Sequence, residues 1–136
     1  MCSIGDIIIV EEPVRDGQVI GRHSFVVVSM TEGKIEGLDF NMVGNIMGSF
    51  DNKSDSYKRM KLSYPENYEI SPTDVTVPNG NSKAGYVKAG VLFYFDTDKL
   101  NYQVIGHVNV SVFNNLIHYI ENLSSVEHVI DNLKEE

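Results

Sequence analysis

The amino-acid sequence predicts a mainly β (α+β) protein, a small β-barrel followed by one C-terminal α-helix. Short runs of β-branched and apolar residues recur along the chain, and turn-forming Gly, Pro, Asn and Asp residues separate them. Helical spacing of apolar residues occurs only near the C-terminus. Because no internal repeat or interdomain linker interrupts this pattern, we expect a single domain over residues 1–136.

The first 50 residues contain the strongest strand signals. Residues 5–10 contain a run of four apolar, β-branched residues at 7–10, and the proline that follows favours a buried strand over a helix. Residues 14–21 contain Asp-Gly and a further glycine, which predict turns. Residues 41–50 are less regular. We therefore expect strands at residues 5–10, 25–28 and 35–40, with a turn at residues 31–34.

The middle of the chain, residues 51–83, is polar and rich in proline. It shows no helical stripe, so short strands and loops are predicted there, with a turn at residues 78–81. Regular structure returns in the last third. The strands expected there are residues 85–89, 91–95 and 102–107, with a turn at residues 96–99 between the second and the third.

The C-terminal helix is predicted over about residues 110–123, after a barrel that spans about residues 4–108. Asn109 or Ser111 can cap its first turn by accepting hydrogen bonds from free N–H groups. Residues 124–136 form a tail with a second short amphipathic turn. The apolar residues at helical spacing in the helix are Phe113, Leu116, Ile117, Ile120 and Leu123.

The chain is acidic, with 11 Lys and Arg against 19 Asp and Glu and a formal net charge of −8. Such a charge repels phosphate at long range, which argues against a protein that coats nucleic acid regardless of sequence. The net charge does not exclude a small cationic site on the surface of an otherwise acidic protein.

Cysteine content and hydropathy exclude several other classes. The single cysteine, Cys2, rules out an internal disulfide and a zinc site built from several cysteines. The four histidines lack metal-ligand spacing and no nucleotide-binding glycine motif occurs, so we expect neither a metal nor a cofactor. No apolar run approaches the ~20 residues of a membrane span, and the N-terminus does not resemble a signal peptide. We therefore expect a cytoplasmic protein.

Several short stretches occur in a characteristic order. GDIIIV at residues 5–10 places Gly-Asp before a strand, and RHSFVVVS at residues 22–29 places basic residues before another. GYVKA at residues 85–89 precedes a strand, DKL at 98–100 and VIGH at 104–107, and a helix follows. In this order the chain resembles the MazF/PemK-like family of toxin endoribonucleases. The resemblance covers roughly residues 4–48 and 84–123. It departs from the family's usual Arg-Pro-aliphatic sequence, where this chain has His-Ser.

The resemblance implies an SH3-like barrel and a metal-independent endoribonuclease that cleaves single-stranded RNA. The implied products are a cyclic phosphate and a free 5′-hydroxyl. A homodimer and an antitoxin protein as partner also follow from the family, whose antitoxins use acidic, disordered segments. Neither DNA nor a membrane is implied as a partner.

The family also implies a basic residue at the end of the first long loop and a Thr or Ser after the third strand. In this sequence those positions correspond to Arg22 or His23 and to Ser49. Alignment by strand length selects His23, whereas alignment by residue type selects Arg22, and the sequence leaves both open. These three residues are the predicted catalytic group.

The chemistry of the Arg-His-Ser stretch fits this role. Arg22 supplies a permanent, fork-shaped phosphate ligand, and His23 can accept or donate a proton near neutral pH. Ser24 is expected to contact RNA beside them. The alternative is structural: Arg22 is a solvated loop charge, His23 caps the end of a strand, and Ser49 hydrogen-bonds its own turn.

The densest basic patch in the sequence consists of Lys58, Arg59 and Lys61, with Tyr57 and Tyr64 nearby. Cations interleaved with aromatic side chains suit the phosphates and bases of a single strand. Lys88 is expected to extend this RNA-binding surface. The alternative for the patch is a solvated loop, and for Lys88 it is an ordinary charge at a strand edge.

A second functional class also fits the sequence. The missing proline, the insecure Ser position and the acidic composition suit a barrel that kept its shape and lost its chemistry. Such a chain would be a non-catalytic protein-binding module, encoded by a phage or another mobile element, or a regulatory domain that acts by dimerisation. Function depends on the site, so the fold alone does not separate these hypotheses.

Overall fold

The computed structural model describes residues 2–78 and 83–134 of the 136-residue chain. The elements in chain order, with η for 3₁₀ segments, are β1 (Asp6–Val10), β2 (Val14–Arg15), β3 (Gln18–Val19), β4 (His23–Ser29), β5 (Gly33–Ile35), β6 (Leu38–Phe40), β7 (Met42–Ser49), α1 (Asp55–Leu62), β8 (Asn67–Ile70), η1 (Pro72–Asp74), β9 (Val75–Thr76), β10 (Gly85–Lys88), β11 (Val91–Phe95), η2 (Thr97–Lys99), β12 (Tyr102–Val108), α2 (Val110–Glu121), β13 (Glu127–Val129) and η3 (Asp131–Leu133).

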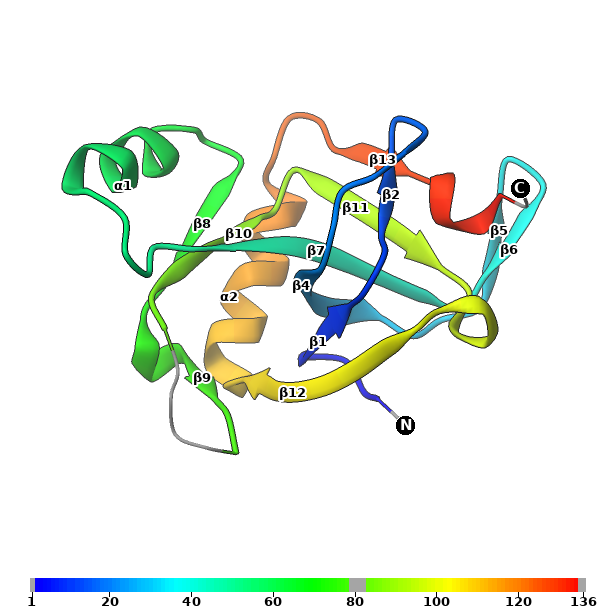
Figure 1. Cartoon of the computed structure of the whole chain (residues 1–136), viewed down its shortest axis with the longest axis horizontal. Helices are drawn as coiled ribbons and strands as arrows, with labels where there is room; N and C mark the ends of the chain where they lie inside the picture. Colours follow the sequence, from blue (N-terminus) through cyan, green and yellow to red (C-terminus); the bar gives the residue numbers. More distant parts are fainter. Residues whose placement is uncertain (1, 79–82, 135–136) are drawn as a thin grey trace.

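One curled, half-barrel sheet organises the molecule. Its strands follow the order β13-β11-β7-β4-β1-β12-β9, and β10 and β8 extend it beside β7. The pairs are antiparallel except for β11 with β13. Figure 1 shows α2 crossing one face of the sheet, with α1 at one end and the β5–β6 hairpin at the other. The predicted class, a small, mainly β barrel with a C-terminal helix, is confirmed.

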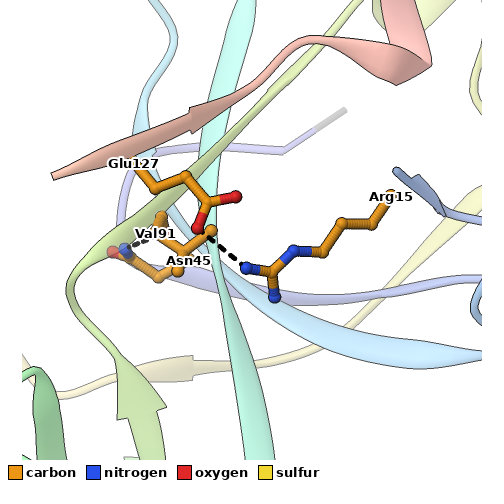
Figure 2. Close-up of polar contacts among 4 residues, drawn as sticks. All are labelled: Arg15, Asn45, Val91 and Glu127. Atoms are coloured by element: carbon orange, nitrogen blue, oxygen red, sulfur yellow. Dashed lines mark hydrogen bonds and ion pairs between the residues drawn. The ribbon is translucent and has the colours of Figure 1, made fainter. Parts of the chain in front are cut away.

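β7 is the central strand, because it pairs with β4 on one side and with both β10 and β11 on the other. The β10–β11 side is interrupted at Ala89 and Gly90, where the chain bulges away from the ladder. The buried Asn45 of β7 bridges this break: its Nδ2 donates to the carbonyl of Lys88 at 3.2 Å. The same Nδ2 donates to the carbonyl of Val91 at 2.8 Å, as Figure 2 shows. One side-chain amide thus replaces the missing ladder bonds.

Successive side chains of a strand point to opposite faces of the sheet, and this divides the buried apolar residues into two clusters. Phe25 of β4 meets Phe93 and Phe95 of β11 edge to face, with ring centroids 5.0 and 5.3 Å apart, inside the curled sheet. On the opposite face, Val26 packs in a cluster with Leu116 of α2. Burial of both faces explains why residues 25–28 form an unbroken apolar run rather than an alternating one.

The predicted helix at residues 110–123 is confirmed as α2. Asn109 occupies the N-cap position, but its side chain makes no capping hydrogen bond. Instead, its Nδ2 donates to the carbonyl of Thr73, and its Oδ1 accepts from the hydroxyl of Thr76. Asn109 therefore ties the start of α2 to the segment around β9.

Three predictions of local structure were wrong. Residues 55–62, expected to be loop, form α1, in which no residue is buried and the Ser54 hydroxyl accepts from the N–H of Tyr57. Gly33–Ile35 and Leu38–Phe40 form the β5–β6 hairpin, rather than a turn at residues 31–34 followed by one strand at 35–40, because Glu36 and Gly37 take positive φ angles at its turn. In the tail, residues 127–129 form β13, which pairs with β11 rather than forming an amphipathic turn.

Two further sequence predictions concern the turn at residues 78–81 and the lack of a membrane span. The turn predicted at residues 78–81 lies largely outside the described residues. Within the described part of the chain, no helix has the length and hydrophobicity needed to cross a membrane.

We expect the substitution Asn45→Leu to lower the free energy of unfolding by about 2–3 kcal/mol, because it removes the donor for two backbone carbonyls at the break. Urea denaturation measures this directly. The matched control is Asn115→Leu on the exposed side of α2, which should change stability by less than about 0.5 kcal/mol. Equal effects of the two substitutions would show that the bridge contributes nothing.

Candidate functional site

A cavity of about 660 Å³ opens at the end of the sheet where β4 begins and β7 ends. We call it the β4–β7 groove. Because β4 and β7 are antiparallel, the first residues of β4 and the last residues of β7 meet at this end. Its polar lining includes Arg22, His23, Ser24, Ser49 and Lys88. The predicted catalytic group and two of the predicted RNA contacts therefore share one cavity.

The groove is cationic although the chain is acidic. Its described lining residues include the cations Arg22, Lys53, Lys83 and Lys88, and none of the described lining residues is Asp or Glu. Two carboxylates lie just outside: Glu11 pairs with Arg22 at 3.1 Å, and Asp51 pairs with Lys83 at 3.0 Å. Both ion pairs are exposed, so each is weak enough for a phosphate to compete for the cation.

His23 is the first residue of β4, and its ring is held by the loop before the strand. Nδ1 lies 2.9 Å from the carbonyl oxygen of Gly21. A carbonyl only accepts, so Nδ1 carries the proton in this contact, and the lone pair of the neutral ring is on Nε2. The arrangement leaves Nε2 as the atom that can take a proton from a bound molecule.

Ser49, the last residue of β7, has the role expected of a turn serine. Its hydroxyl oxygen accepts from the backbone N–H of Asp51 at 3.0 Å. This contact uses the oxygen as an acceptor, so the hydroxyl proton can still be donated into the groove. The structural alternative for Ser49 and its presence in the groove are therefore compatible.

A cluster of aromatic rings forms one wall of the groove. Tyr86 lies over Gly48, where an added Cβ would come within 2.4 Å of the ring, so only glycine leaves this space open. The Tyr86 ring is 5.3 Å from that of Phe50. Burial, with a side-chain hydrogen bond to Tyr57 as the second cause, raises the pKa of Tyr86 to about 12. Tyr86 is therefore a neutral hydrogen-bonding group at any physiological pH.

The predicted basic patch lies on α1 beside the groove rather than in it. Lys61 sits over the rings of Tyr57 and Tyr86, at 5.5 and 5.9 Å from their centroids, and Lys58 sits 5.8 Å from that of Phe50. Arg59 is on the exposed side of the helix. The stretch predicted to be loop is thus a helix that holds two cations against aromatic rings at the edge of the groove.

Lys88 ends β10 and lines the groove at the side that faces α1. Its neighbour β8 pairs with β10, so Lys88 is not at a free sheet edge, contrary to the structural alternative. Burial lowers the pKa of Lys88, and the nearby charges of Lys61 and Arg15 lower it further. Lys61 of α1 and Arg15 of β2 therefore lie close enough to Lys88 of β10 for their charges to act on it.

Sequence reasoning did not include Lys53 or Tyr86 among the site residues. Lys53 lies in the loop before α1, with its amine 5.2 Å from the centroid of the Tyr57 ring, and Tyr86 lies on β10. Tyr86 reaches the groove because β10 pairs with β7, and this pairing joins residues almost forty positions apart in the sequence. The available signal for Lys53 was the gathering of Lys53, Lys58 and Lys61 on both sides of Tyr57 in the sequence.

Comparison with known proteins adds no family to this description. No protein-family model matches the chain. The search of curated proteins also found no similar sequence. Within the described residues, no three His, Cys, Asp or Glu side chains gather in a way that could hold a metal ion.

We expect Tyr86 to make stability fall in alkali. Its pKa is about 12 in the folded protein, against about 10 when unfolded, so folding favours the protonated form. That contribution is complete below pH 10 and is lost as the pH rises to 12, at up to about 1.4 kcal/mol per pH unit.

Urea denaturation between pH 9 and 12 measures this loss. The wild type should lose stability more steeply than Tyr86→Phe, while Tyr64→Phe, which changes a tyrosine that is 44% exposed, should follow the wild type. Parallel curves for wild type and Tyr86→Phe would contradict the burial of this hydroxyl.

Proposed function

We propose that this chain is a metal-independent endoribonuclease that cleaves single-stranded RNA in the β4–β7 groove. The observation that supports this most strongly is the charge of the groove. A chain with a net charge of −8 gathers Arg22, Lys53, Lys83 and Lys88 around His23, with no carboxylate among the described lining residues. Such a local excess of cations attracts a polyanion at short range.

Single-stranded RNA suits this surface better than a duplex. Tyr57, which lines the groove and is partly exposed, offers a ring for an unstacked base, and the cations around it offer contacts to phosphates. Lys58 and Lys61 on α1 continue the charge beyond the groove. Together they form a path for a flexible backbone in which bases and phosphates alternate.

In the proposed reaction the ribose 2′-hydroxyl attacks the adjacent phosphorus, forming the 2′-O–P bond, and the P–O5′ bond breaks. Nε2 of His23 takes the 2′-hydroxyl proton as general base. The leaving 5′-oxygen takes a proton from the resulting imidazolium or from water. Arg22 stabilises the charge on the phosphorane oxygens, and the Ser49 hydroxyl donates a hydrogen bond to one of them. The products are a 2′,3′-cyclic phosphate and a 5′-hydroxyl.

We expect cleavage of a long single-stranded RNA in the presence of EDTA, at discrete positions. Substitutions His23→Ala and Arg22→Ala should each reduce the rate by ~100-fold or more, because one removes the base and the other the cation that meets the transition-state charge. Mapping of the 5′ ends and of the terminal phosphate gives the rates and the products.

The matched control is Lys34→Ala, which removes an exposed, ion-paired cation from the β5–β6 hairpin. It should cleave at the wild-type rate. Wild-type rates in both His23→Ala and Arg22→Ala would remove these residues from the mechanism. RNA that binds and stays intact would instead favour the non-catalytic binding module.

A further inference from the structure

A second cavity, of about 390 Å³, adjoins the β4–β7 groove on the side of α1. We call it the Arg15 pocket. Its lining comes from segments far apart in the chain: Arg15 of β2, Lys61 of α1, Asn67 of β8, Lys88 of β10 and Glu127 of β13. Lys88 lines both cavities, so the pocket and the groove meet at this side chain.

The Arg15 pocket concentrates positive charge. The positions of Arg15 and Lys61 lower the pKa of Lys88, so the three cations lie within each other's fields. Two carboxylates, Glu66 and Glu127, line the same pocket. Figure 2 shows the guanidinium of Arg15 reaching Glu127, with Nη2 2.9 Å from Oε1. Three cations against two carboxylates leave the pocket with an excess of one positive charge.

The hydrogen bonds of this cluster are incomplete. Nε of Arg15 is buried and has no acceptor among the described residues. A buried donor without a partner is unfavourable, so this Nε is a group that a bound anion can satisfy. Oδ1 of Asn67 in the same pocket also lacks a partner among the described residues, as does Oδ1 of Asn45, but both are acceptors and give an anion no contact. Among the described residues, Glu127 accepts one hydrogen bond from the Arg15 guanidinium, through Nη2. The other N–H groups of this guanidinium can donate to an anion.

We propose that the Arg15 pocket binds a phosphate of the same RNA strand, flanking the phosphate that is cleaved in the groove. This inference rests on the proposed function. Arg15 provides the forked donor, Lys88 is shared between the two phosphates, and Lys61 closes the pocket from α1. Glu127 competes with the phosphate for the guanidinium and so sets how tightly the pocket binds.

A single strand is favoured over a free anion because the two cavities share Lys88 as a lining residue. A strand held in the groove presents its next phosphates at high effective concentration to the adjoining pocket. A pocket with an excess of only one positive charge gains most from a ligand that is already held beside it.

The test is fluorescence anisotropy with end-labelled, randomised 2′-fluoro RNA of three or nine nucleotides, which has no 2′-hydroxyl and stays intact. Substitution Arg15→Gln should weaken binding of the nine-nucleotide RNA roughly 10-fold and leave the three-nucleotide RNA unchanged. The slope of log K against log salt for the longer RNA should fall by about 0.7, the value for one phosphate contact on a single strand.

A second variant separates an effect on binding from an effect on folding. Substitution Glu127→Gln removes the competing carboxylate while keeping Arg15, and it should tighten binding of the nine-nucleotide RNA by about 3-fold, a gain that damage to the fold does not produce. The matched control Lys34→Gln, which breaks the exposed pair with Asp39, should leave both affinities unchanged.

The outcomes separate the two proposals. If wild type binds both RNAs and Arg22→Gln weakens both, the groove binds RNA. In that case, no effect of Arg15→Gln, or an equal loss for both lengths, overturns the Arg15 pocket alone. If wild type binds neither RNA, the proposed function fails and the pocket proposal falls with it.

Discussion

The break between β10 and β11, bridged by the buried amide of Asn45, is the constraint on which both cavities depend. The carbonyls of Lys88 and Val91 are fixed by this amide, so the residues on either side of the break have defined directions. Before it, β10 stays beside β7 and keeps Tyr86 over Gly48 in the groove. After it, β11 pairs with β13 and so brings Glu127 to the Arg15 pocket. Lys88 lies at the break and lines both cavities.

Charge in this protein is organised locally rather than globally. The net charge of −8 repels nucleic acid at a distance, but screening at physiological salt limits that repulsion to about 8 Å. Arg22, Lys53, Lys83 and Lys88 nevertheless line one cavity. The acidic body therefore disfavours loose contacts with nucleic acid along the surface, and under the proposed function the groove is where the strand is held. This distribution favours selective binding over coating.

The sequence predicted those elements whose signal is local. Strand β4 and helix α2 carry their burial pattern in consecutive residues, and the Arg-His-Ser stretch at the start of β4 lies in the groove with Ser49. Helix α1 was missed because nothing in it is buried: its cap at Ser54 and the contacts of its lysines with rings replace an apolar stripe. The Arg15–Glu127 pair joins residues 112 positions apart, a contact that no single-sequence pattern encodes.

Chemical-shift mapping of the ¹⁵N-labelled protein with a 2′-fluoro single-stranded RNA tests the central claim most directly, because it locates binding without requiring cleavage. The account predicts that the backbone signals of His23, Ser49, Tyr86 and Lys88 shift in proportion to bound RNA, with saturation. The β5–β6 hairpin, at the far end of the molecule in Figure 1, should stay unchanged. Shifts confined to surfaces outside the groove, or no shifts at high RNA concentration, would contradict the account.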